Sequence, residues 1–172
     1  FLVGGTGSRV LRPLIMQLAA GVLPTDDNGN KTPLELVPII IDPHKANEDL
    51  KRTENLLRNY SQLHNSIYGD KVDICDGFFA AKISTLSDIT ANTQDIPDTF
   101  LFNLGSVDSK RFAEFIGFNT LDSANQALCS MMFSKYQLDT KMDIGFVGSP
   151  NIGSVAINQF KDSNEFKQFS NM

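Results

Sequence analysis

Gly4-Gly5-Thr6-Gly7-Ser8-Arg9 is the stretch of sequence around which the rest of this chain is organised. Residues 1–3 precede it as an apolar run typical of the end of a strand. Apolar side chains follow it at helical spacing, which predicts an amphipathic helix. These side chains belong to Val10, Leu11, Leu14, Ile15, Leu18 and Val22. A strand, a glycine turn and a helix in this order present backbone N–H groups and a helix dipole to an anion. The stretch therefore predicts a phosphate-binding turn, and the alternative is a tight turn without a ligand.

Composition narrows the class of protein. The chain has 172 residues, of which 41% are apolar and 20% are charged, as expected for a globular domain with a core. Its net charge of -5 argues against a nucleic-acid partner. No apolar run approaches the roughly 20 residues that a membrane helix needs. We therefore expect a cytoplasmic protein that binds neither nucleic acid nor a membrane.

Cysteine and histidine are scarce in this sequence. Cys75 and Cys129 are the two cysteines, and their spacing matches no metal motif. We expect buried free thiols, with a disulfide as the alternative. His44 and His64 are the two histidines, so neither a histidine-rich metal site nor a Ser-His-Asp triad is expected.

A second strand and a long helix are predicted after the loop-like residues 24–30. Residues 36–41 form an apolar run interrupted by Pro38, and Asp42 stands at its tip. That carboxylate is placed either to bind a ribose hydroxyl or to cap the following helix. Helical spacing extends over residues 46–67. Asn47 at its start could contact sugar or phosphate, or could cap the helix.

Sequence patterns that predict secondary structure are weaker in the middle of the chain. Residues 72–83 suggest a strand or a hairpin around Asp76-Gly77, and residues 84–99 are loop-like. Residues 100–104 could be a short strand or a buried loop. Helices are expected over residues 109–118 and 122–138. The second helix carries a methionine-rich apolar stripe, which we expect to belong to the core rather than to bind a ligand. The stripe comprises Ala124, Leu128, Met131, Met132 and Tyr136.

Residues 143–156 form a second glycine-rich loop that runs into a helix. Ser149-Pro150 fits an N-cap followed by proline at the first helical position. This geometry again favours an anion at a helix N-terminus. The two glycine-rich loops could converge on one ligand beyond the carboxyl ends of the strands, where open α/β sheets bind their ligands.

Three pieces of the chain resemble the tubulin and bacterial cell-division tubulin (FtsZ) superfamily. Residues 3–8 resemble its first glycine-rich loop, residues 145–156 resemble its third phosphate loop, and the strand ending at Ile41-Asp42 resembles its second strand. The family's Gly-Gly-x-Thr-Gly signature after the fourth strand is absent. We therefore expect residues 1–172 to form a single α/β, Rossmann-like domain: a partial parallel sheet with flanking helices, incomplete at its C-terminal end and similar to the N-terminal part of a tubulin-type GTPase domain.

The resemblance implies binding of GTP or GDP with Mg²⁺. It places the N–H groups of residues 5–8 on the α- and β-phosphates and those of Gly148, Asn151 and Ile152 near the γ-phosphate, and Arg9 could add a charged contact. Hydrolysis would need groups absent from this sequence, so we assign no catalytic or metal-ligating residue. The expected partners are the nucleotide and either a second copy or the remainder of a parent chain. The candidate nucleotide-binding residues are Gly4, Gly5, Thr6, Gly7, Ser8, Arg9, Asp42, Asn47, Gly145, Gly148, Ser149, Asn151, Ile152 and Gly153.

Two other functions stay open. Gly5-Thr6-Gly7-Ser8-Arg9-Val10 partly matches the fingerprint of NAD(P)-binding Rossmann domains, but valine replaces its third glycine or alanine. The chain could also be a non-catalytic assembly protein with a vestigial nucleotide fold. A Walker-type ATPase is not expected, because no Gly-Lys-Ser/Thr follows the glycines.

Overall fold

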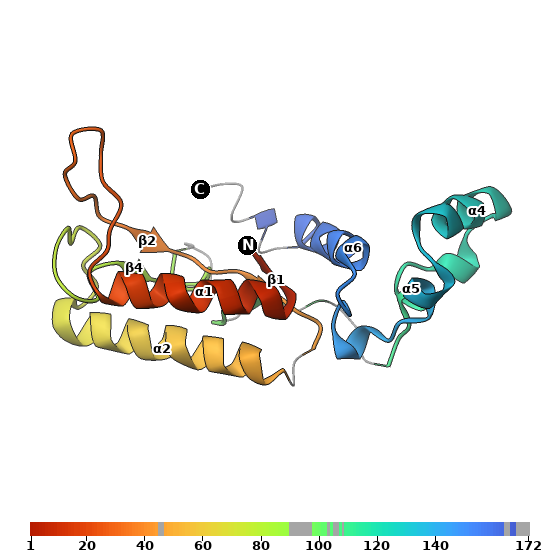
Figure 1. Cartoon of the computed structure of the whole chain (residues 1–172), viewed down its shortest axis with the longest axis horizontal. Helices are drawn as coiled ribbons and strands as arrows, with labels where there is room; N and C mark the ends of the chain where they lie inside the picture. Colours follow the sequence, from red (N-terminus) through yellow and green to blue (C-terminus); the bar gives the residue numbers. More distant parts are fainter. Residues whose placement is uncertain are drawn as a thin grey trace. The chain divides into compact units, whose positions relative to one another are not determined.

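The computed structural model describes residues 1–44, 47–89, 98–102, 104, 107, 109–163 and 166–167. Over these residues the chain is an α/β protein with small parallel sheets, compatible with a partial Rossmann-like arrangement (Figure 1). The expected fold class is confirmed in this form. Two compact units are present: unit 1 comprises Phe1–Ile40 and Ala46–Leu101, and unit 2 comprises Ile41–Lys45 and Phe102–Met172.

Short strands make up the sheets. A three-stranded sheet has the order β1 (Leu2–Val3), β3 (Ile40–Ile41), β5 (Leu101–Phe102), and β2 (Glu35–Leu36) pairs in parallel with β4 (Lys82–Ile83). The strand predicted over residues 36–41 is therefore divided between two sheets. Pro38 lies at the division, where its missing N–H cannot donate to a ladder. Of the two alternatives for residues 100–104, a short strand or a buried loop, the strand is confirmed as β5.

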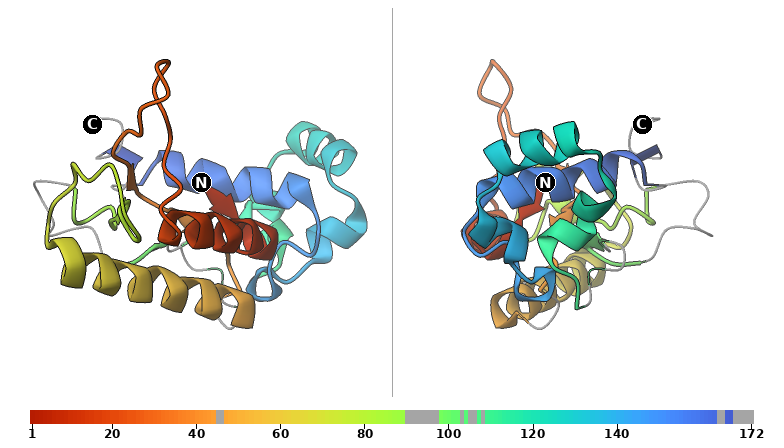
Figure 2. Two further views of the ribbon diagram at one scale, coloured as in Figure 1. Left: turned by 60° about the vertical axis from the view of Figure 1, so that its left-hand side comes forward. Right: turned by 90° about the vertical axis from the view of Figure 1, so that its right-hand side faces the viewer.

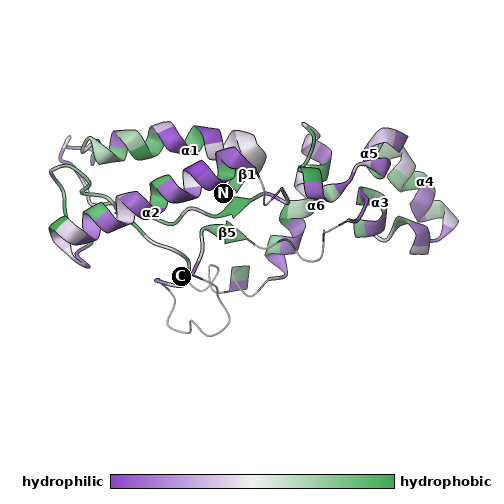
Figure 3. Cartoon of the chain, turned by 90° about the horizontal axis from the view of Figure 1, so that it is seen from below, coloured by the Kyte–Doolittle hydropathy of each residue, from purple (hydrophilic) through white to green (hydrophobic). Residues whose placement is uncertain are grey.

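Two long helices lie side by side in unit 1, α1 (Gly4–Ala19) and α2 (Glu48–Tyr68) (Figures 1 and 2). Helical periodicity predicted both. Figure 3 shows hydrophilic and hydrophobic residues alternating along α2, as expected of a half-buried helix. The predicted stripe of α1 is correct in part, because Leu11, Ile15 and Leu18 are buried whereas Val10, Leu14 and Val22 are exposed. The core of unit 1 includes Leu11, Ile15, Leu18, Ile40, Leu50, Leu57, Tyr60 and Phe100.

The loop prediction for residues 24–30 is confirmed, and this segment projects as a narrow excursion closed by a bridge between Thr25 and Lys31 (Figure 2). Of the two alternatives predicted for residues 72–83, the strand is confirmed at its end as β4, and the hairpin around Asp76-Gly77 is wrong. Side chains of α2 take several carbonyl groups of this segment: the His64 ring contacts those of Lys71 and Phe79, and the Tyr68 hydroxyl donates to that of Phe78. These contacts replace a strand ladder. Of the predicted loop 84–99, residues 90–97 lie outside the described residues, as does residue 103.

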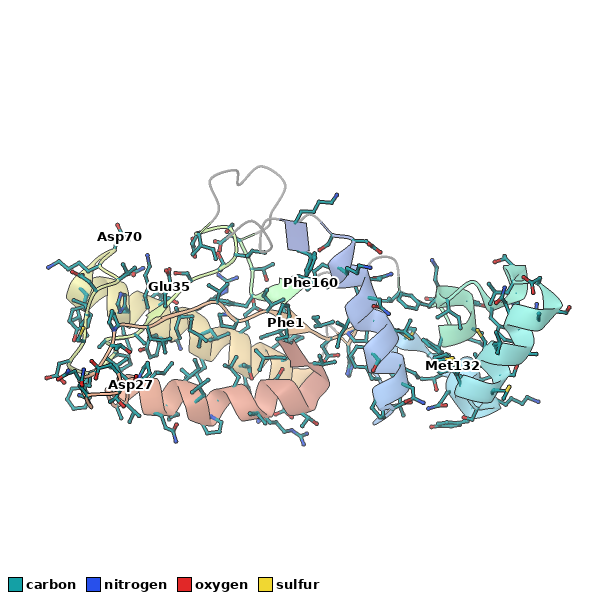
Figure 4. The ribbon with its side chains drawn as sticks, turned by 90° about the horizontal axis from the view of Figure 1, so that it is seen from above. Phe1, Asp27, Glu35, Asp70, Met132 and Phe160 are labelled. Carbon is teal, nitrogen blue, oxygen red and sulfur yellow. The ribbon has the colours of Figure 1, made fainter. Side chains whose placement is uncertain are left out.

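Unit 2 consists mainly of short helices. They are α3 (Phe112–Phe115), η1 (Phe118–Thr120), α4 (Ser123–Met132), α5 (Lys135–Asp139), η2 (Met142–Ile144) and α6 (Pro150–Lys161). The helix predicted over residues 109–118 is thus mostly absent. The helix predicted over residues 122–138 is broken between α4 and α5, where Ser134 caps α5. The break turns Phe133 inward, 4.9 Å from the Phe112 ring centroid. Phe160, labelled in Figure 4, packs edge-on against Phe102.

The core prediction for the methionine-rich stripe is wrong. Met131 is 84% exposed and Met132 65%, and Leu128 and Tyr136 are also exposed. Figure 4 labels Met132 at the end of α4. Phe133 fills the place that the stripe was expected to occupy. Both cysteines are free thiols, as expected, but Cys75 is exposed and Cys129 half-buried, so their predicted burial is wrong. Among the described helices, none is long and apolar enough to cross a membrane.

Candidate functional site

The first glycine-rich stretch lies inside α1, which begins at Gly4 directly after β1. This differs from the predicted turn that precedes a helix. The N-cap is Val3, whose apolar side chain makes no capping hydrogen bond. Gly4 has φ +66°, which lets the chain pass from strand to helix within one residue. The first-turn N–H groups of Gly4, Gly5 and Thr6 therefore have neither an intrahelical partner nor a capping side chain at the N-cap.

Two glycines of this stretch allow close approach. A Cβ atom on Gly7 would lie 2.8 Å from the carbonyl carbon of Leu2, so glycine brings α1 tightly against β1. A Cβ atom on Gly5 would lie 3.2 Å from Nδ2 of Asn47. The structure thus brings the start of α1 together with Asn47, which caps α2 by accepting a hydrogen bond from the Asp49 N–H. The capping alternative for Asn47 is confirmed.

Ser8 points away from the exposed end of the helix. Its side chain is fully buried, and its Oγ has no hydrogen-bond partner among the described residues. Its carbonyl oxygen accepts from Thr53 Oγ1 at 3.2 Å, which joins α1 to α2. As the fifth residue of α1, Ser8 lies beyond the first turn, so its N–H belongs to the intrahelical ladder. The position of Ser8 therefore suits helix packing rather than direct contact with a phosphate.

Arg9 lies on the surface and pairs with a carboxylate. Its Nε lies 2.9 Å from Asp49 Oδ2, and Arg12 reaches Oδ1 of the same residue at 3.0 Å. The hydrogen bond from Arg9 is the largest of the favourable contacts that lower the pKa of Asp49 below its ordinary value of 3.8. Sequence reasoning missed Asp49 and Thr53. The spacing of apolar residues in α2 could have identified them, because it places Asp49 and Thr53 on the side of the helix that faces α1.

Asp42 lies in unit 2 and follows β3. Its Oδ1 accepts a hydrogen bond from the His44 N–H at 2.9 Å, and the side chain is buried. The capping alternative for Asp42 is wrong, because Asn47 caps α2. Asp42 Oδ1 also lies 3.9 Å from the position of a Cβ atom on Gly145. The structure thus brings together two candidate residues, Asp42 and Gly145, that are far apart in the sequence.

The second glycine-rich stretch leads into α6 as predicted, with Ser149 at the N-cap and Pro150 as the first helical residue. Three residues shortly before α6 have positive φ angles: Gly145, Val147 and Gly148. Ser149 does not cap with its side chain, whose Oγ instead accepts from Gln137 Nε2 at 2.6 Å. Sequence reasoning missed Gln137 because α5 was expected to continue α4.

The remaining candidate residues of α6 differ in exposure. Asn151 is exposed, and its Nδ2 donates to the Met132 carbonyl. Ile152 and Gly153 are buried, so they can offer only backbone groups to a ligand. The expected phosphate contacts in unit 2 therefore depend on the backbone from Gly148 to Ile152.

Two clefts lie mostly away from these candidate residues. A polar cleft of about 480 Å³ in unit 1 is lined by residues of α2 and β4, including Arg58, Asn65 and Lys82. In unit 2 a cleft of about 460 Å³ includes one candidate, Asn151. Over the residues that the structure describes, no three His, Cys, Asp or Glu side chains gather as they would around a metal ion.

No family model matches the chain, and no curated protein or solved structure matches it. The two glycine-rich helix starts are therefore the features of the chain that bear on its function.

Proposed function

We propose that the chain binds a nucleotide through its phosphates, at the N-terminal end of α1. One observation carries this proposal: three uncapped N–H groups, from Gly4 to Thr6, start a helix that follows a sheet strand directly. Strand-to-helix turns of this kind bind phosphate, because the glycines admit an oxygen to the backbone and the helix dipole favours negative charge.

The surroundings of this helix start favour an anion. Asn47 brings its side-chain amide close to Gly5, and Asn47 is itself the start of a second helix, α2. Two positive dipole ends therefore lie in one region. Two guanidinium groups, of Arg9 and Arg12, share a single carboxylate, Asp49. These three side chains together carry one net positive charge, and the nearby Glu48 is paired with Arg52, although the chain as a whole carries -5.

In the tubulin-type form of this proposal the nucleotide is GTP or GDP. The N–H groups of Gly4, Gly5 and Thr6 serve the α- and β-phosphates, and the resemblance to the tubulin family implies that the backbone of Gly148, Asn151 and Ile152 serves the γ-phosphate. Mg²⁺ is held mainly by phosphate oxygens and water, as is usual for this ion. The same proposal includes completion of the nucleotide pocket, either by a second copy of the chain or by the remainder of a parent chain. It does not include hydrolysis of the nucleotide, because no residue of this chain is assigned to activate water.

NAD(P) is the second candidate. It is favoured by Asp42, a carboxylate that directly follows β3, the neighbour of β1 in the sheet. In dinucleotide-binding folds an acidic residue at the end of the second strand binds the ribose. The His44 N–H already bonds to one oxygen of Asp42, which leaves less of the carboxylate for a sugar.

Equilibrium binding of fluorescent GTP and of NADPH to the whole chain, with and without Mg²⁺, tests the proposal. We expect GTP binding that weakens about 10-fold or more in Gly5→Ala, since an added Cβ crowds the phosphate contact. Arg9→Ala and Arg12→Ala form a matched pair, because each removes one ion pair to Asp49. Only Arg9→Ala should weaken GTP binding strongly.

Three outcomes would overturn or redirect the proposal. Absence of binding to either nucleotide would favour an assembly protein with a vestigial nucleotide fold. NADPH binding that Asp42→Ala abolishes would favour the dinucleotide function. GTP binding that Gly148→Ala leaves unchanged would refute the two-loop, tubulin-type pocket while leaving phosphate binding at α1 in place.

A further inference from the structure

His64 is a fully buried histidine in the C-terminal half of α2. Its Nδ1 lies 2.8 Å from the carbonyl oxygen of Phe79, and its Nε2 lies 3.1 Å from that of Lys71. A carbonyl oxygen only accepts hydrogen bonds, whereas a neutral imidazole has one donor and one acceptor nitrogen. Both contacts are hydrogen bonds only when each ring nitrogen carries a proton.

The two carbonyl groups belong to the ends of one segment, residues 71–79, which forms no helix or strand. Its other attachments include a hydrogen bond from Tyr68 Oη to the Phe78 carbonyl, one from the Phe79 N–H to the Ala19 carbonyl, and an ion pair between Asp76 and Lys31. The Phe79 ring also packs edge-on against Tyr60, and Ile74 packs against the core of unit 1. Asp70, labelled in Figure 4, precedes the segment just beyond α2. His64 therefore holds both ends of the segment against the helix.

The groups around His64 set the balance between its two charge states. Tyr60 and Tyr68 lie one turn before and after it on α2, with the Tyr68 ring 5.4 Å away. The end of α1 contributes no charged side chain in its last turn. The charged or titratable side chains of the facing segment are those of Lys71, Asp73, Cys75 and Asp76, and Asp70 directly precedes it.

We propose that His64 is a pH-dependent clasp on residues 71–79. The doubly protonated ring donates to both carbonyl groups and closes the segment on α2. As pH rises through the range of about 5 to 8 in which histidine changes charge, the ring loses one proton and one of the two bonds. The segment then opens at that end. This device is independent of the nucleotide site.

Nitrogen NMR of the two histidine rings in the whole chain tests the protonation step. We expect both His64 nitrogens to carry protons at the acidic end of the range, and one to lose its proton as pH rises. His44, whose ring makes no such pair of contacts among the described residues, is the internal control. A His64 ring that keeps one unprotonated nitrogen at every pH would refute the proposal.

Hydrogen exchange of the amides in residues 71–79 tests the opening. After correction for the intrinsic pH dependence of exchange, we expect opening to increase about 2- to 10-fold from acidic to basic pH, the worth of one hydrogen bond. His64→Gln should abolish this dependence, and His44→Gln should retain it. Equal dependence in both variants would refute the clasp. If His64→Gln fails to fold, the wild-type exchange and the NMR titration still decide.

Discussion

The two glycine-rich helix starts look alike in sequence but use glycine for different physical reasons. At α1, Gly7 provides space, because a Cβ atom there would lie 2.8 Å from the carbonyl carbon of Leu2. Before α6, Gly148 provides backbone conformation: its φ is +66°, and a Cβ atom would meet nothing within 4 Å. The comparison teaches that a glycine motif predicts a helix start without revealing whether packing, conformation or a ligand requires the glycine.

Gly7→Ala should have the largest effect on stability. The added methyl group forces α1 away from β1, and overpacking of this kind costs about 2 kcal/mol of unfolding free energy, even after the gain in helix propensity. Denaturant unfolding of the whole chain measures it. The variant is a poor probe of nucleotide binding for the same reason.

Gly5→Ala is the matched control for that experiment. Its Cβ atom would meet the end of a side chain, Asn47 Nδ2 at 3.2 Å, rather than the backbone. We expect a change within about 1 kcal/mol. Equal destabilisation by the two substitutions would show that close packing on Leu2 is not what Gly7 supplies.

Local signals explain what could be predicted of the fold. The periodicity of α1 and α2 follows from their own residues, and Asn47 and Ser149-Pro150 mark where α2 and α6 begin. Each of these signals depends on contacts within one or two helical turns. The α/β class follows from the order of such elements.

Long-range contacts explain what could not be predicted. Phe133 packs on Phe112, which breaks the expected helix and leaves Met131 and Met132 exposed. His64 takes two carbonyl groups that a hairpin would have used. Phe112 and Phe133 are 21 residues apart, and a histidine ring that contacts backbone carbonyl groups leaves no periodic pattern, so periodicity predicted neither the helix break nor the absence of a hairpin.

The candidate site was predictable as two helix starts but not in its details. Sequence reasoning found the glycines, Asn47 and Asp42, because their residue types are typical of such positions. It missed that Ser8 is buried and that Asp49 binds Arg9, since both facts depend on how α1 packs against α2.

Gly148→Ala should have the second largest effect. Alanine at a positive φ lowers the free energy of unfolding by about 1 to 2 kcal/mol, because its Cβ comes too close to the carbonyl oxygen that follows it in the chain. Gly148→Asn should cost less, since asparagine adopts this conformation more readily. Thermal or denaturant unfolding measures both. If the asparagine variant is as destabilised as the alanine variant, conformation is not the reason for glycine at this position.

The serines of the two stretches sharpen the comparison further. Ser149 Oγ accepts a bond from Gln137, so Ser149→Ala should cost about 1 kcal/mol. Ser8 Oγ is buried without a partner in the described part of the chain, so Ser8→Ala should be neutral or slightly stabilising. Unfolding of both variants under one set of conditions compares them. A strongly destabilised Ser8→Ala would mean that its hydroxyl has a hydrogen-bond partner in solution.

Asp49→Asn should have the smallest effect on stability. It tests an ion pair beside the start of α1. The hydrogen bond from Arg9, together with the charges of Arg9 and Arg12, holds the pKa of Asp49 below 3.8 in the folded chain. A lowered pKa stabilises the fold above the unfolded value, so this contribution is lost as pH falls below about 3.8 through the folded value. In Asp49→Asn the free energy of unfolding should therefore fall less steeply with decreasing pH below pH 4. Because the carboxylate is partly exposed and its partner Arg9 lies on the surface, the change is small. In an Arg9→Gln background, Asp49→Asn should change the pH dependence of unfolding below pH 4 by less. The reason is that the hydrogen bond from Arg9, the largest contribution to the lowered pKa of Asp49, is already absent. An equal change in both backgrounds would assign the acid sensitivity to another carboxylate.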